Sequence, residues 1–205
     1  MPVDAVKAKL LADLCIQYWE YDTKPDFSDP DALEANSPEK LLFDIYDSLK
    51  EEVLESYPWR SVIKFTTLTT TTPSALVDDK YSRSVNMPLD FLKEDAFWYD
   101  SKRNNPLLDG VEIVGKIAKT NLEKFTMSYI SKDVVESNMD SWLISYLKIY
   151  IAANAADIGG LSAERKAQLL QQADNDFWSC SNTDWKMANK HNDALEASIN
   201  EFVIS

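Results

Sequence analysis

The chain has 205 residues, of which 34 are acidic and 21 basic, so its formal net charge is −13. That length can bury a sizeable core without disulfide bonds or metal ions. A protein that binds nucleic acid on its own needs an excess of Lys and Arg to displace counterions from phosphates, so the charge argues against that role. Two cysteines, Cys15 and Cys180, form no disulfide framework, and a single histidine, His191, leaves little for a metal site.

Neither a membrane span nor a secretion signal is expected. The longest apolar runs are well short of the ~18 residues that a membrane helix needs. Residues 1–9 contain no hydrophobic signal core. We therefore expect a protein that is made in a reducing cytoplasm and has no membrane partner.

Two helices are predicted in the N-terminal part of the chain. Residues 4–19 repeat apolar side chains at four-residue steps, which is typical of an amphipathic helix, and Cys15 is expected in its packed core. After a polar connection, Ser37 and Pro38 predict the start of a second helix, because a hydroxyl caps helix ends and proline is favoured at the first helical position. Pro58 ends this helix near residue 56.

The period changes to that of β structure after the second helix. Residues branched at Cβ, including the run Thr66–Thr72, favour a strand that follows Ser61. Pro88–Leu92 is predicted as a turn. Further short strands are predicted at 81–87 and 95–100, and a hairpin is predicted from Val111–Ile117 and Glu123–Ile130.

The chain returns to helix after Ser131. Residues 140–158 are apolar nearly all round, which predicts a helix buried on more than one side. Gly159 and Gly160 are expected to end it, and Ser162 to cap a following helix that extends to Phe177. The short link predicts that these two helices are antiparallel neighbours.

The predicted fold is α+β, with a helical bundle built from both chain ends and an inserted, mainly antiparallel β domain. The bundle comprises residues 1–59 and 132–180, the β-rich insertion residues 60–131, and residues 181–205 a C-terminal arm or helix that orders on contact. Charge follows the same division: residues 1–57 have a net charge of −9, residues 58–131 of +1 and residues 132–205 of −5.

No catalytic, cofactor or metal site is recognisable in the sequence. With four glycines in the chain there is no Gly-rich phosphate loop. One group has the residue types for chemistry: Asp90, Glu94 and Asp95 lie beside an aromatic cluster, and two carboxylates that flank a sugar bond can hydrolyse it. A glycan- or cell-wall-degrading enzyme that uses Asp90 with Glu94 or Asp95 is therefore the alternative function, and a solvated turn beside core aromatics is the structural alternative.

Aromatic residues point instead to protein contacts. Six tryptophans are more than a core of this size needs, and aromatic anchors are enriched at protein interfaces. Trp142, Tyr146 and Tyr150 form a candidate subunit contact, with burial in their own bundle as the alternative. The threonine run is a candidate binding strip, or an edge strand or loop. A host-side interaction module stays open as a third function.

Four segments occur in an order that carries a family resemblance. A helix ends in Tyr57-Pro58-Trp59-Arg60-Ser61, which continues into Val62–Leu68, and the turn Pro88-Leu89-Asp90-Phe91-Leu92 follows. The aromatic strand Phe125–Ile130 then precedes Trp142–Ile158, Gly159-Gly160 and Ala163–Phe177. This order resembles the tail tubular protein A, or head-to-tail adaptor, family of short-tailed bacteriophages. The resemblance covers residues 38–178; residues 131–140 lack the family's Asp-Pro-type step, and residues 181–205 have no counterpart.

The resemblance implies a structural virion protein that is not an enzyme and has no cofactor. Such proteins form a ring, usually dodecameric, beneath the portal protein; they extend the DNA channel and provide a platform for the next tail or ring protein. DNA would pass through without specific binding, because an acidic ring repels phosphates. The protein would be made in the bacterial cytoplasm and reside in the tail or neck of the virion.

This resemblance gives expected roles to particular residues. Glu51, Glu52 and Glu55 are candidate channel-lining acids, with an outer solvated face as the alternative. The candidates for docking onto the portal or a neighbouring subunit are Trp185, Leu195 and Phe202.

Overall fold

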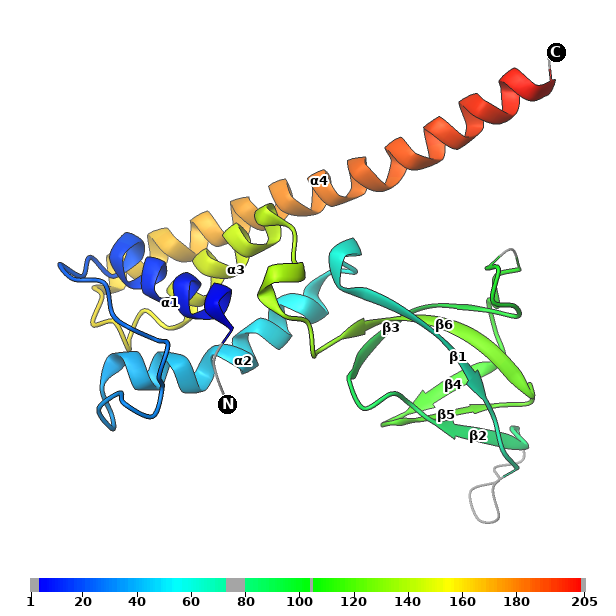
Figure 1. Ribbon diagram of the computed structural model, residues 1–205, viewed down its shortest axis with the longest axis horizontal. Helices are drawn as coiled ribbons and strands as arrows, with labels where there is room; N and C mark the ends of the chain where they lie inside the picture. Colours follow the sequence, from blue (N-terminus) through cyan, green and yellow to red (C-terminus); the bar gives the residue numbers. More distant parts are fainter. Residues whose placement is uncertain (1–3, 73–79, 104, 204–205) are drawn as a thin grey trace. The chain divides into compact units, whose positions relative to one another are not determined.

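The computed structural model describes residues 4–72, 80–103 and 105–203, and side chains in the last helix as far as Met187. Over those residues the protein is mixed α and β, with four α-helices and two small antiparallel sheets (Figure 1). The chain divides into two compact units. Residues 1–61 and 135–205 form the first, called the helical unit here, and residues 62–134 form the second, called the β unit.

The two predicted N-terminal helices are confirmed, together with the capping chemistry of the second. Helix α1 is Ala5–Tyr18 and helix α2 is Pro38–Ser56. The Lys40 N–H donates to Ser37 Oγ at 3.1 Å, and Pro38 occupies the first helical position. The start of α2 therefore follows from local sequence.

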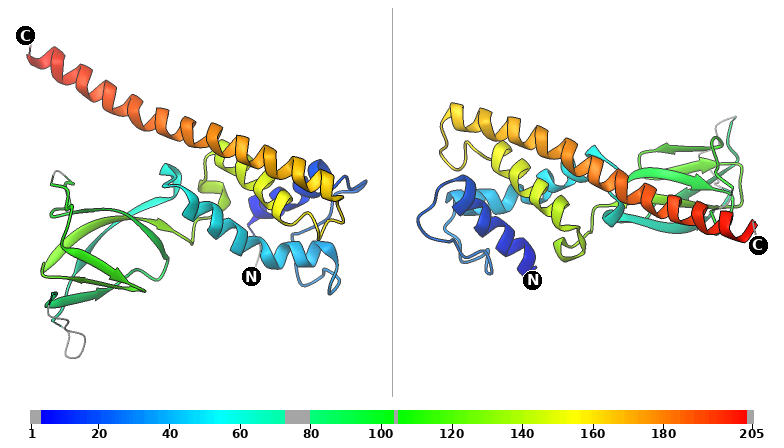
Figure 2. Two further views of the ribbon diagram at one scale, coloured as in Figure 1. Left: turned by 180° about the vertical axis from the view of Figure 1, so that it is seen from behind. Right: turned by 90° about the horizontal axis from the view of Figure 1, so that it is seen from above.

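Helix α3, Ser141–Asn154, lies at the centre of the helical unit. It packs against α1, α2 and α4 (Figure 2). Its buried residues lie on several sides of the helix, as the apolar composition predicted: Leu143, Tyr146, Leu147, Ile149, Ile151, Ala152 and Ala153. Burial on more than one side is therefore confirmed.

The helix ends earlier than predicted, and the glycine pair has a different role. Helix α3 ends at Asn154, and turns follow as far as Gly160. A Cβ on Gly159 would lie 2.4 Å from the buried indole ring of Trp19, so this position requires a residue without a side chain. Gly160 has φ +70°, a left-handed conformation that glycine adopts without strain.

Helix α4, Ala163–Val203, is one continuous helix of 41 residues. Ser162 caps it as predicted, since the Arg165 N–H donates to Ser162 Oγ at 3.2 Å. The predicted end at Phe177 is wrong, because no Gly or Pro occurs between residues 163 and 203 to stop the helix. The segment 181–205 is helical to Val203; the side chains of His191, Leu195 and Phe202 lie outside the described residues.

The β unit contains two three-stranded sheets. The first has strand order β1-β6-β3 and the second β2-β5-β4. The strands are β1 Ile63–Thr69, β2 Arg83–Asn86, β3 Phe91–Trp98, β4 Val111–Val114, β5 Ile117–Thr120 and β6 Lys124–Ser131. The threonine run thus lies partly in β1, an edge strand, which is one of the two structures expected for it.

The predicted hairpin is wrong. Gly115, with φ +62°, turns the chain after Val114, so β4 pairs with β5. Strand β6 instead pairs with β1 and β3 in the other sheet. Alternate residues of β6, namely Phe125, Met127 and Tyr129, face a core that residues of both sheets share.

Candidate functional site

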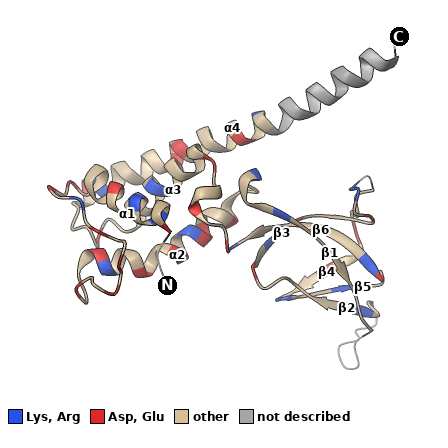
Figure 3. Ribbon diagram, viewed as in Figure 1, with Lys and Arg blue, Asp and Glu red and all other residues tan. Residues whose placement is uncertain are grey.

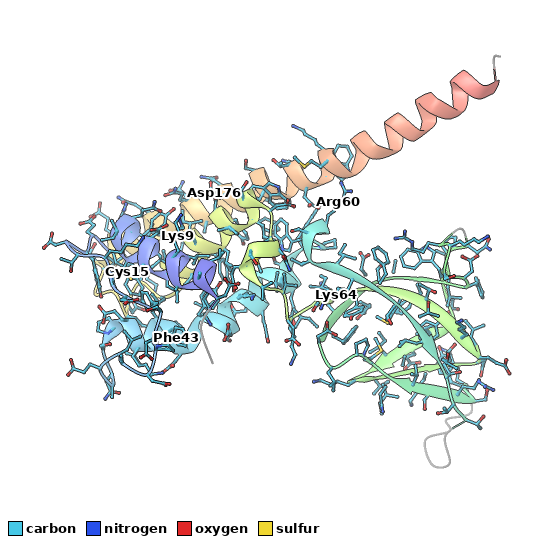
Figure 4. The ribbon with its side chains drawn as sticks, viewed as in Figure 1. Lys9, Cys15, Phe43, Arg60, Lys64 and Asp176 are labelled. Atoms are coloured by element: carbon cyan, nitrogen blue, oxygen red, sulfur yellow. The ribbon has the colours of Figure 1, made fainter. Side chains whose placement is uncertain are left out.

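Asp90 is a carboxylate of the β unit that has three side-chain hydrogen-bond donors. It lies in the turn before β3 and accepts hydrogen bonds from Lys64 Nζ (2.6 Å), Ser131 Oγ (2.8 Å) and Tyr129 OH (3.0 Å). Lys64 extends from β1 (Figure 4), so this carboxylate joins β1, β6 and the turn. Burial raises the Asp90 pKa, but the three hydrogen bonds outweigh this and lower it to about 2.

Asp95 does not share a site with Asp90. Ser128 Oγ donates to Asp95 at 2.6 Å, whereas Asp90 bonds to Tyr129 and Ser131. Since successive residues of a strand point to opposite faces, the two carboxylates bond to opposite faces of β6. Glu94 is exposed and opposite Tyr129 in register.

Asp90 therefore has the environment of a structural anchor. A general acid needs a pKa near the working pH, and a carboxyl with a pKa of about 2 remains ionised at neutral pH. Its oxygens are occupied by three donors of its own unit. Across the described residues, no group of three or more His, Cys, Asp or Glu side chains is arranged to hold a metal ion.

Both cysteines have unreactive surroundings. Cys15 is fully buried in α1, as predicted, and burial raises its thiol pKa to about 12 (Figure 4). Cys180 is buried in α4, where its Sγ donates to the Trp142 carbonyl at 3.4 Å and burial raises its pKa to about 11. Because the thiolate is the nucleophile, neither position favours cysteine chemistry.

The helical unit contains a buried ion pair that sequence reasoning missed. Lys50 Nζ on α2 lies 2.8 Å from Glu136 Oε1, and Tyr46 OH donates to the same oxygen at 2.7 Å. Glu136 is 3% exposed. Nothing local marks this glutamate, which is 86 positions from its lysine partner in the sequence.

The three candidate channel acids differ in exposure. Glu52 and Glu55 are exposed on α2, and Glu51 is half-buried. Tyr150 OH donates to Glu52 Oε2 at 2.9 Å, and burial together with this bond raises the Tyr150 pKa to about 12. The two exposed acids are thus the better placed for a solvent-facing role.

The predicted contact residues of α3 are buried or half-buried within the helical unit. Tyr146 is 4% exposed and its ring contacts Trp59 and Phe177. It has almost no surface left for a second subunit, so the expectation for this residue is corrected. Trp142 and Tyr150 are half-buried.

Exposed tryptophans occur on α4 instead. Trp178 is 66% exposed and Trp185 is 59% exposed. They are seven residues apart, close to two helical turns, so they lie on the same side of the helix. We call these two residues the tryptophan face. Trp185 is a predicted docking residue, whereas the sequence pattern gave Trp178 no individual role.

The net charge of the chain lies in the helical unit. The residues of the helical unit include 24 acidic and 11 basic ones, a net charge of −13, whereas those of the β unit include ten of each. Figure 3 shows the described charged residues of each unit. A pocket of about 450 Å³ beside the loop that follows α1 is itself lined by Asp26, Asp29, Glu34 and Glu39.

No protein-family model and no curated protein matches the chain. Among the described residues, no helix combines the length and the apolarity needed to cross a bilayer.

Proposed function

We propose that the chain is a subunit of the head-to-tail connector ring beneath the portal of a short-tailed bacteriophage. In this role it is a structural protein of the virion that extends the DNA channel and supports the next tail component. The two chain ends form the helical bundle of the subunit, and the β unit is an insertion into it. The observation that best supports an assembly role is the tryptophan face of α4.

Helix α4 has one side for its own unit and another for a partner. Leu169, Ala173 and Cys180 are buried on the side toward the helical unit. At about 100° per residue, Trp178 and Trp185 lie well away from that side. Large exposed aromatic side chains are typical anchors of protein interfaces and are costly to leave in water. The tryptophan face thus supports contact with a neighbouring subunit or with the portal protein.

The charge distribution fits passage of DNA. A conduit must not hold phosphates tightly, and an acidic surface repels them. The helical unit has the whole net charge of the chain, and Glu52 and Glu55 are exposed on it. We propose that these acids face the channel, and that DNA passes without specific binding.

The oligomeric state tests this proposal. We expect the purified chain, alone or with the portal protein of the same phage, to form ring-sized assemblies in light scattering coupled to gel filtration. The double variant Trp178→Ser/Trp185→Ser should lose assembly and keep its helical circular dichroism. Leu89→Ser, which changes an exposed residue of the β unit, is the matched control and should assemble normally. Assembly by the double variant as efficient as that of the wild type would refute the role of the tryptophan face.

A further inference from the structure

A small pocket lies on the β unit, away from the shared core of its sheets. It has a volume of about 260 Å³ and is lined by Phe65, Thr66, Thr67, Ser101, Arg103 and Thr126. In register, Phe65 pairs with Ser128 and Thr67 with Thr126. The side chains of Phe65, Thr67 and Thr126 therefore belong to the face of the β1-β6-β3 sheet opposite the one that bears Phe125, Met127 and Tyr129. The connection after β3 supplies Ser101 and Arg103.

The connection after β3 holds Arg103 in place. The Tyr99 N–H donates to the Asn105 carbonyl at 3.0 Å, and Asn105 Nδ2 donates to Asp100 Oδ2 at 3.0 Å. Arg103 has φ +61°, a left-handed conformation that is costly for a residue with a side chain and is found where surrounding structure enforces it. The guanidinium carbon lies 4.2 Å from the centroid of the Phe65 ring.

The Arg103 guanidinium is available for a ligand. Within the described parts of the chain, its N–H groups have neither an ion pair nor a hydrogen bond. The guanidinium lies over the Phe65 ring, and its N–H groups form the planar fork that matches carboxylate and phosphate oxygens. Arg83, by contrast, donates from Nε to Thr70 Oγ1 at 3.0 Å.

A second donor lines the same pocket. Thr67 Oγ1 and Thr126 Oγ1 are 3.0 Å apart, and Thr126 is buried. A hydroxyl pair uses one of its two protons internally, so the other proton remains for a ligand. A cation and a hydroxyl donor beside an aromatic ring make a pocket for negatively charged oxygen.

We propose that this pocket binds an oxyanion, a carboxylate or a phosphate group, with the Arg103 guanidinium as the bidentate donor and the Thr67–Thr126 hydroxyl pair as the second donor. The pocket is smaller than the ~300–1,000 Å³ of sites for drug-sized molecules, so it takes a single charged group. This proposal goes beyond the connector role and does not depend on it.

Arginine side-chain NMR tests the proposal on the full chain. The chain has four arginines, Arg60, Arg83, Arg103 and Arg165, so their Nε–Hε signals can be assigned individually. Inorganic phosphate and sodium acetate are titrated separately at constant ionic strength, with sodium chloride as the reference. We expect a saturable shift of the Arg103 signal while the other three signals do not saturate. Saturation by acetate identifies a carboxylate ligand, and saturation by phosphate alone identifies a phosphate ligand.

Two variants sharpen this test. Arg103→Lys retains the charge but loses the planar fork, and should weaken binding at least tenfold when the Thr126 amide is followed. Phe65→Leu removes the ring and should weaken binding roughly twofold to fivefold, as expected for an exposed cation–π contact. The proposal is overturned if neither probe gives a saturable Arg103 shift, if all four arginines shift alike, or if Arg103→Lys binds as tightly as the wild type.

Discussion

Each unit contains a structural carboxylate, and the two carboxylates differ in their burial and in their hydrogen-bond donors. In the helical unit Glu136 is fully enclosed and depends on one lysine and one tyrosine. In the β unit Asp90 remains partly open to solvent and has three donors. Burial makes an ion pair costly to break, whereas solvent screens a partly exposed one. Breaking the interactions of the carboxylate should therefore lower the free energy of unfolding more in the helical unit than in the β unit.

The largest expected effect is in the helical unit. Lys50→Met leaves the buried Glu136 carboxylate without its cation, and we expect the free energy of unfolding to fall by about 3–5 kcal/mol. Urea unfolding followed by circular dichroism measures this loss. The double variant Lys50→Met/Glu136→Leu removes both charges and should recover a large part of it. A loss in Lys50→Met no greater than that of a surface lysine variant would refute the contrast between the units.

A second pair of variants tests packing in the helical unit. Gly159→Ala places a methyl group against the rigid Trp19 indole, and we expect a loss of about 2–3 kcal/mol. Gly160→Ala, in open space but with φ +70°, should cost only about 1 kcal/mol because its strain is purely conformational. Thermal unfolding of both variants checks the order. Equal costs would mean that the close approach to Trp19 does not determine this turn.

The β unit should show the smaller effect and a distinct pH dependence. Asp90→Ala removes the common acceptor of Lys64, Tyr129 and Ser131, and we expect a loss of about 1–2 kcal/mol at neutral pH. The folded pKa of Asp90 is depressed from 3.8 to about 2. Its stabilisation is therefore complete above about pH 4 and declines as the pH falls toward 2.

Hydrogen exchange of β6 amides across this pH window measures the effect on the β unit alone. Asp90→Asn is the matched variant, because it retains the shape without the titrating group. In this variant the protection of the β6 amides should lack the decline with falling pH that is expected for the wild type. A wild-type protection profile that stays flat between pH 5 and pH 2 would contradict the assigned role of Asp90.

The smallest effect is expected at Asp184 on α4. This buried carboxylate accepts from the Arg60 N–H at 3.3 Å, and burial raises its pKa. The charged form is thus penalised in the folded state, so Asp184→Asn should slightly increase stability at neutral pH. The gain should vanish as the pH falls below 3.8, where the carboxyl is neutral in both states. Guanidinium unfolding at two pH values checks the sign, and a loss of stability at neutral pH would contradict it.

The helix caps were predictable from the sequence, whereas one turn and the contacts between distant residues were not. The Ser37 and Ser162 caps could be read directly, because a cap depends on residues three positions apart. The β4–β5 turn was missed because a lone glycine inside an apolar run gives only a weak turn signal. The Lys50–Glu136 ion pair and the Arg103–Phe65 contact could not be predicted, since each depends on residues far apart in the sequence.

The most direct test of the account is electron microscopy of the purified chain mixed with the portal protein of the same phage. We predict rings of this chain seated coaxially on the portal, with an open central channel, and loss of those rings in Trp178→Ser/Trp185→Ser. Portal rings that remain bare beside a monomeric chain would contradict the proposed connector function.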